Sequence, residues 1–195
     1  MMSNHPVLER IRSYVTVEMG QNDPAHDGAH VERVVKLTRT LCDMYPEADA
    51  YRAELLAWIH DMSDDKLSTN HGAESLRELL LSFGAKEEDA AYVTEALPYI
   101  SYRKYPRLGP EVDLEIRMVQ DADRIDAMGA IGIGRTFAFG GAKNRPLEES
   151  LRHFDEKLLK LYDLLGTEGG KILAKSRFEF LRSFYRQFQM EFYGK

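Results

Sequence analysis

The stretch Leu55-Leu-Ala-Trp-Ile-His-Asp-Met62 combines a regular helical pattern with an unusual polar pair. Its large apolar residues recur at the i, i+3, i+4 and i+7 positions of one helical face. They are Leu55, Trp58, Ile59 and Met62. The spacing predicts a helix over residues 47–62, opened by Pro46.

The pair His60-Asp61 is unexpected at this place in a helix. The five positions before it are apolar, so this part of the helix should be largely buried. A buried carboxylate without a partner costs on the order of several kcal/mol, or its pKa shifts until the group is neutral. A cation that holds both side chains would remove this cost. The alternative is that Asp61 caps the helix or pairs locally at its end, and the pair alone does not decide between the two.

Most of the remaining chain also has the periodicity of helices. The predicted helices span residues 6–19, 28–44, 72–83, 86–100, 111–128, 147–165 and 169–192. Loops are expected at 63–70, 106–110 and 142–146, and the glycine-rich run 129–141 interrupts the regular pattern. Alternating strand patterns are nearly absent. The predicted fold class is therefore all-α, in a single compact domain.

A second polar anomaly lies in the predicted helix 111–128, which is apolar on more than one side. It contains Gln120-Asp-Ala-Asp-Arg-Ile-Asp126. A helix turns by about 100° per residue, so Asp121 and Asp123 point in different directions and are not expected to bind one metal together. Periodicity does not choose between them. Asp126 lies one turn after Asp123 and is expected to be its neighbour.

These residues together offer the donors of a metal site. His26 and His30 lie near the start of the helix 28–44, and His60-Asp61 ends the helix 47–62. Two histidines and two carboxylates suit a divalent first-row metal with open positions for water and substrate. Such a metal acidifies a bound water and polarises a phosphoryl oxygen.

Composition limits the classes of partner. The chain has 195 residues, 44% of them hydrophobic, with a net charge of −6. This balance argues against binding to a nucleic-acid polymer or an anionic membrane, because both need clustered positive charge. Cys42 is the only cysteine, and no stretch approaches the ~20 apolar residues that cross a bilayer. The expected location is cytoplasmic.

Three short segments, in order, carry a resemblance to a known family. They are His30 within His-Val-Glu-Arg-Val, the pair His60-Asp61, and Asp123 within Ala-Asp-Arg. They resemble the HD-domain metal-dependent phosphohydrolase superfamily. The flanking segments 121–137 and 153–161 look like a small stand-alone bacterial branch of it, so the resemblance covers roughly residues 22–192.

The resemblance implies an all-α HD-domain helical bundle with additional C-terminal helices. Residues 1–21 would be an N-terminal helix packed on the core, 22–128 the metal-binding core, and 129–195 a C-terminal helical extension. One divalent metal ion (Mn, Fe, Co, Ni, Mg or Zn) would be held by His30, His60, Asp61 and Asp123. The residue before the arginine is the usual ligand in this family, which favours Asp123 over Asp121.

Family members often carry an acid and a lysine just after the His-Asp pair. Asp64 or Asp65 would then orient the attacking water, and Lys66 would meet a phosphate oxygen. The alternative is an ordinary polar loop. His71 is a candidate for a second metal site, and a loop or helix-start residue is the favoured interpretation of it.

Several neighbouring residues have both a functional and a structural interpretation. Arg33, one turn after His30, would bind substrate phosphate or pair with an acid near the metal. Arg124 would serve catalysis as a substrate clamp, or be a structural pair. His26 would face the substrate if the helix has begun there, whereas Asp27 reads as an N-cap. Arg135, Lys143, His153 and Lys157 lie in segments that the resemblance marks, and a solvated face is the favoured interpretation of these four.

The predicted function is hydrolysis of a phosphate ester or anhydride in a small phosphorylated molecule, and this molecule is expected to be nucleotide-like. One alternative is a non-catalytic metal- or nucleotide-binding regulatory module, although such modules usually lose a ligand. A third hypothesis, oxygen-dependent cleavage at an iron pair, needs more ligands than the sequence supplies. A homodimer is left open.

Overall fold

The computed structural model describes residues 5–19, 28–62 and 72–194, and the part that it describes consists of helices, turns and loops without a strand. The α-helices are α1 (Pro6–Met19), α2 (Gly28–Met44), α3 (Ala50–Ile59), α4 (Ala73–Ser82), α5 (Glu87–Ile100), α6 (Leu114–Asp126), α7 (Gly129–Ala142), α8 (Leu147–Glu156) and α9 (Glu168–Tyr193). The predicted all-α fold is confirmed. None of the described helices is long and apolar enough to span a membrane.

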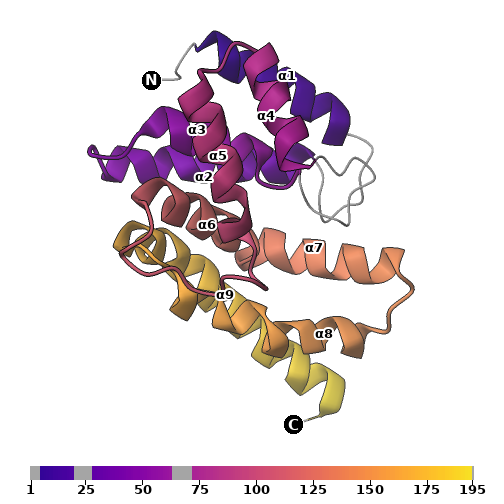
Figure 1. Cartoon of the computed structure of the whole chain (residues 1–195). Coiled ribbons are helices and arrows are strands. Elements are labelled where there is room, and N and C mark those ends of the chain that lie inside the picture. The colour runs from indigo at the N-terminus through magenta and orange to yellow at the C-terminus, as the bar shows by residue number, and fades with distance from the viewer. Residues whose placement is uncertain (1–4, 20–27, 63–71, 195) are drawn as a thin grey trace.

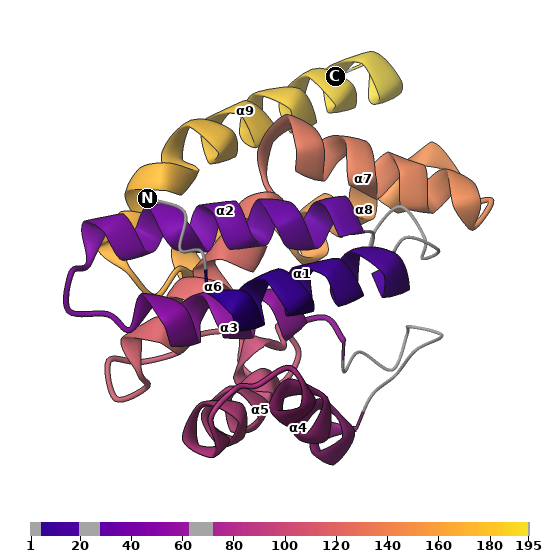
Figure 2. The ribbon, with the colours of Figure 1, turned by 90° about the horizontal axis from the view of Figure 1, so that it is seen from above.

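The helices form two groups that share α6 (Figure 1). In the first group α2 packs between α3 and α6, while α1 covers α2 and α3, and α4 pairs with α5 (Figure 2). Its core contains Val34, Leu55, Trp58, Met118 and Ala122, all nearly inaccessible to solvent. A second core lies among α7, α8, α9 and the end of α6. The cores meet along α6 because both of its faces are buried.

Local signals define several helix ends. Asp49 caps α3, and its carboxylate accepts from the backbone N–H groups of Tyr51 and Arg52 at 3.1 Å each. The helix therefore starts at Ala50, three residues after the predicted start at 47. Thr167 caps α9 in the same way, and Gly194, at a φ of 67°, ends it.

The expectation that the glycine-rich run 129–141 interrupts regular structure is wrong, because the run forms helix α7. At Gly132 and Gly140 the missing side chain allows a neighbouring group to approach closely. A Cβ at Gly132 would lie 2.1 Å from the carbonyl oxygen of Ala127. Gly129 has a φ of 73°, in the left-handed region that glycine adopts most easily. Packing against α8 and α9 thus overrides the low helix propensity of glycine.

The predicted helix 147–165 is also corrected, since it is interrupted. Helix α8 ends at Glu156, and two short 3-10 turns follow, Leu158–Lys160 and Tyr162–Leu164. The break falls at Lys157, whose backbone (φ −134°, ψ −61°) leaves the helical region. The turns bury Leu158, Leu161 and Leu165 in the second core.

Candidate metal centre

Four side chains from α2, α6 and the end of α3 converge where these helices of the first group pack together. His30 lies in the first turn of α2 and is 2% exposed. His60 and Asp61 directly follow α3, and Asp123 lies on α6. The tight packing of α2 against α3 and α6 brings these residues together. The structure thus gathers the four side chains that the sequence singles out as ligands.

The donor atoms face one another at short distances. His30 Nε2 lies 3.4 Å from an oxygen of Asp61, 3.4 Å from Asp123 Oδ1 and 3.4 Å from His60 Nε2. His60 Nε2 lies 3.5 Å from Asp61 Oδ1. Ligand atoms of His30, His60 and Asp61 all lie within 4.8 Å of one another. His30, His60 and Asp61 therefore form one tight group of donors, and Asp123 joins it through its contact with His30.

Hydrogen bonds on the far side of each ring determine which nitrogen faces this group of donors. His60 Nδ1 lies 2.8 Å from the carbonyl oxygen of Ala57, which can only accept, so Nδ1 carries the proton. His30 Nδ1 lies 2.8 Å from Asp126 Oδ2 and donates to that carboxylate in the same way. When both rings are neutral, each Nε2 atom carries an unprotonated lone pair. The two Nε2 atoms are 3.4 Å apart, and His30 Nε2 also faces the carboxylates of Asp61 and Asp123. A cation among these four acceptors removes the repulsion between them.

The arrangement fits a divalent metal ion. Two ligands bound at ~2.1 Å, at octahedral to tetrahedral angles, lie roughly 3.0 to 3.4 Å apart, and the observed separations are 3.4 to 3.5 Å. A histidine that binds metal through Nε2 usually donates Nδ1–H to a carboxylate or a backbone carbonyl. His30 and His60 supply one example of each.

The pKa shifts reflect the same concentration of negative charge. Burial alone would lower the pKa of His30, but hydrogen bonds to Asp123, Asp126 and Asp61 raise it well above its ordinary value. Burial would raise the pKa of Asp123, and the contact with His30 outweighs it and lowers that pKa strongly. A proton on His30 and a divalent cation compete for the same acceptors, so cation binding displaces the proton.

Asp126 orients His30 and also binds two arginines. Its fully buried carboxylate accepts from Arg33 Nε at 2.7 Å, from Arg33 Nη2 at 3.1 Å and from Arg135 Nη1 at 2.6 Å. Burial would raise its pKa, but hydrogen bonds from His30 and Arg33, with the charge of Arg135, lower it. The sequence placed Asp126 beside Asp123, whereas its contacts are with His30. The favoured interpretation of Arg135 as part of a solvated face is not what the structure shows, because its side chain is 18% exposed.

We expect Asp126→Asn to weaken metal binding by about 10- to 100-fold, the usual effect of changing a residue that orients a metal-bound histidine. The amide cannot accept from His30 and both arginines as the carboxylate does. Isothermal titration with Mn²⁺ or Zn²⁺ measures the change, and circular dichroism checks the helical content. Metal affinity equal to that of the wild type would contradict the role assigned to Asp126.

The two aspartates that periodicity could not separate point to different places. Asp123 faces His30, whereas Asp121 accepts from the backbone N–H of Gly166 at 2.8 Å and of Thr167 at 2.9 Å. The Thr167 hydroxyl donates to the same carboxylate at 2.7 Å. Burial raises the pKa of Asp121 despite these bonds. Asp121 therefore fixes the start of α9.

Arg124 is directed away from the donor cluster and has a structural environment. It is 3% exposed, and its Nη1 and Nη2 donate to the carbonyl oxygens of Leu164 at 2.6 Å and Tyr105 at 3.1 Å. Burial lowers its pKa. These bonds tie two loops to α6, so of the two interpretations of Arg124 the structural one matches the geometry.

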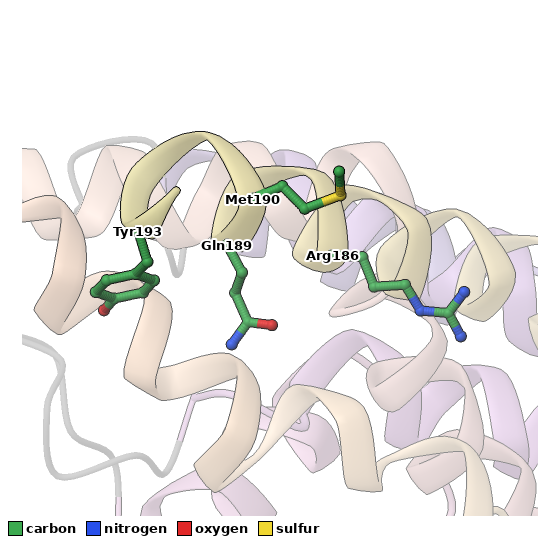
Figure 3. Close-up of a pocket in the computed structure, with 4 residues that line it drawn as sticks. All are labelled: Arg186, Gln189, Met190 and Tyr193. Carbon is green, nitrogen blue, oxygen red and sulfur yellow. The ribbon is translucent and has the colours of Figure 1, made fainter. Parts of the chain in front are cut away.

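Other predicted site residues lie outside the described part of the chain. These are His26, Asp64, Asp65 and Lys66, together with His71 and Asp27. A surface pocket on α9 (Figure 3) is lined by Arg186, Gln189, Met190 and Tyr193. It contains none of the candidate residues and offers no histidine or carboxylate, so it does not bear on the metal centre.

Comparison with known proteins shows which family the chain is similar to. A family model described as HD domain matches residues 28–128. The uncharacterized protein YpgQ of Bacillus subtilis is 34% identical over 193 residues, which cover 95% of this chain and 94% of that protein. The crystal structure of YpgQ in complex with ADP superposes with a TM-score of 0.83 at 32% identity, covering 95% of this chain and 94% of that one. An HD-superfamily hydrolase from Bacillus thuringiensis gives a TM-score of 0.75 at 33% identity, covering 96% and 97%.

Proposed function

The chain belongs to the HD domain family, and on that premise we propose that it is a metal-dependent phosphohydrolase. Its substrate in this proposal is a small phosphorylated molecule, nucleotide-like in character, and the bond cleaved is a phosphate ester or anhydride. The expected cofactor is one divalent metal ion, and Mn, Fe, Co, Ni, Mg and Zn are the candidates.

One observation carries this proposal. The Nε2 atoms of two histidine rings and two carboxylates meet within a few ångströms, and each ring is held by a hydrogen bond on its other nitrogen. When both rings are neutral the members of this set repel one another, and a bound divalent cation would remove that repulsion. His30, His60, Asp61 and Asp123 are the proposed ligands.

The chemistry of the proposed reaction divides between the cofactor and the chain. A bound divalent metal ion supplies an acidified water and a polarised phosphoryl oxygen. Asp126 and the carbonyl of Ala57 keep His30 and His60 in the tautomer that presents Nε2. We propose that Asp64 or Asp65 takes the proton of the attacking water and that Lys66 meets a phosphate oxygen.

A phosphorylated ligand is supported by a relative. YpgQ, which covers nearly the whole chain at 32% identity, has been crystallised with ADP. Arg33 and His26 remain proposed substrate-binding residues, and Arg33 is considered further below. Arg124 is not carried into this proposal, because its guanidinium is buried on two backbone carbonyls.

The experiment that tests the function is hydrolysis of a substrate panel. Purified protein, stripped of metal, is incubated with nucleoside mono-, di- and triphosphates and with phosphomonoesters, with each of Mn²⁺, Co²⁺, Ni²⁺, Zn²⁺ and Mg²⁺ added separately and Fe²⁺ added under anaerobic conditions. We expect release of phosphate or pyrophosphate from at least one substrate, only with metal. Tight nucleotide binding without turnover under every metal would instead favour the regulatory module.

A further inference from the structure

Asp126 is shared by two arginines from different helices. Arg33 comes from α2 and Arg135 from α7, and the two meet on one carboxylate although they lie far apart in the sequence. Figure 2 shows the N-terminal half of α2 and α7 on the same side of the molecule. The Asp126 carboxylate also accepts from His30 Nδ1, which is a ring of the metal centre. Both guanidinium groups are therefore one residue away from a proposed metal ligand.

The carboxylate of Asp126 meets more than one cationic group. Arg33 and Arg135 both donate to it, and so does the ring of His30. Among the described residues the centre holds the carboxylates of Asp61, Asp123 and Asp126 beside the two arginines, and a bound divalent cation would add positive charge to it. Added positive charge favours the binding of an anion. Elsewhere in the described chain the ratio is reversed at Arg52, which meets two carboxylates, Asp89 at 2.7 Å and Asp49 at 3.7 Å.

Exposure and geometry suit a phosphate. Asp126 is fully buried, whereas the side chains of Arg33 and Arg135 are 29% and 18% exposed. Asp126 holds both guanidinium groups in fixed positions, and arginine presents planar donors that match phosphate oxygens. Preorganised cations beside a metal are the usual means of binding a phosphoryl group that is to be cleaved.

We propose that Arg33 and Arg135, held together by Asp126, form the phosphate-binding side of the metal centre, with Arg135 as a residue that the sequence did not assign to the site. The inference rests on the proposed phosphohydrolase function. Its ligand class is a phosphoryl anion, as an ester, an anhydride or free phosphate. The two arginines bind the anion, while His30 and its companions bind the metal.

The test separates phosphate binding from metal binding. Arg135→Gln removes the charge, and Arg135→Lys keeps it without the planar fork. Isothermal titration measures Mn²⁺ affinity first, and then the affinity of the manganese-loaded protein for ADP and for inorganic phosphate. We expect Arg135→Gln to bind Mn²⁺ within about threefold of the wild type and both anions about 10- to 100-fold more weakly, the usual effect of losing a charged hydrogen bond. Arg135→Lys should recover part of this loss.

Arg52→Gln is the matched control. Arg52 Nε donates to Asp89 Oδ1 at 2.7 Å, and their side chains are 30% and 9% exposed, close to the values of the Arg33–Asp126 pair. The residue lies eight positions before His60, about 12 Å along the helix axis. We expect this variant to bind Mn²⁺, ADP and phosphate as the wild type does.

Each outcome decides the inference. Equal anion affinity in Arg135→Gln and the wild type would overturn it and leave the proposed function standing. A parallel loss of Mn²⁺ affinity would also overturn it, because Arg135 would then act by positioning a metal ligand. If wild-type protein loaded with Mn²⁺ bound neither anion and hydrolysed nothing in the panel, the proposed function would fail together with the inference.

Discussion

Replacing Asp61 with alanine is expected to abolish metal binding while the helical fold survives. Asp61 follows the last turn of α3 and supplies a carboxylate within 3.4 to 3.5 Å of both ring nitrogens. Its side chain is 14% exposed and stands at the edge of the apolar core, so the truncation leaves no large cavity. The loss of affinity should exceed the ~10- to 100-fold effect of changing a residue that only orients a ligand.

Metal content after dialysis measures this loss, by mass spectrometry of the metal, together with the rate of phosphate release from the best substrate of the panel. Circular dichroism should give the helical content of the wild type. Asp163→Ala is the control, since Asp163 is an exposed aspartate in the turn Tyr162–Leu164. Unchanged metal content in Asp61→Ala would remove the foundation of the proposed site.

The helices were predictable where the apolar pattern and the breaks between helices agree. The bounds 6–19 and 28–44 match α1 and α2 in full. The helix at 129–141 was not predictable, because glycine has a low helix propensity and therefore indicates irregular structure. The helix forms because α7 packs against α8 and α9, and these tertiary contacts cannot be seen in the local sequence. The break at Lys157 was missed for the same reason. Apolar spacing continues through it, and only the second core shows where the chain must turn.

The candidate site divides in a similar way. The pair His60-Asp61 was conspicuous because a buried charge needs a partner, and the structure places it in the donor cluster. Asp121 and Asp123 could not be ranked from periodicity, because α6 is buried on both faces and each face holds one of them. Arg135 carried no local signal of its own, since its contact with Asp126 depends on where α7 packs.

Asp121→Ala and Asp123→Ala should have opposite effects, although the two residues are of one type and two positions apart on α6. Asp121→Ala is expected to destabilise the fold by about 3 kcal/mol, because three donors at Gly166 and Thr167 lose their acceptor at roughly 1 kcal/mol or more each. For a chain of this size that lowers Tm by about 6 to 12 °C. Its metal affinity should stay near that of the wild type.

Asp123→Ala should instead lose metal binding and lower the metal-free Tm by less than Asp121→Ala does. Its partly exposed carboxylate contacts His30 and supports no backbone donor in the described structure. Differential scanning calorimetry without metal and titration with Mn²⁺ measure both quantities for each variant. Since α6 carries both residues, any general damage to this helix would appear in both variants. If Asp121→Ala lost metal binding but kept full stability, the roles of the two aspartates would be exchanged. The structural role on α6 would then have been assigned to the wrong carboxylate.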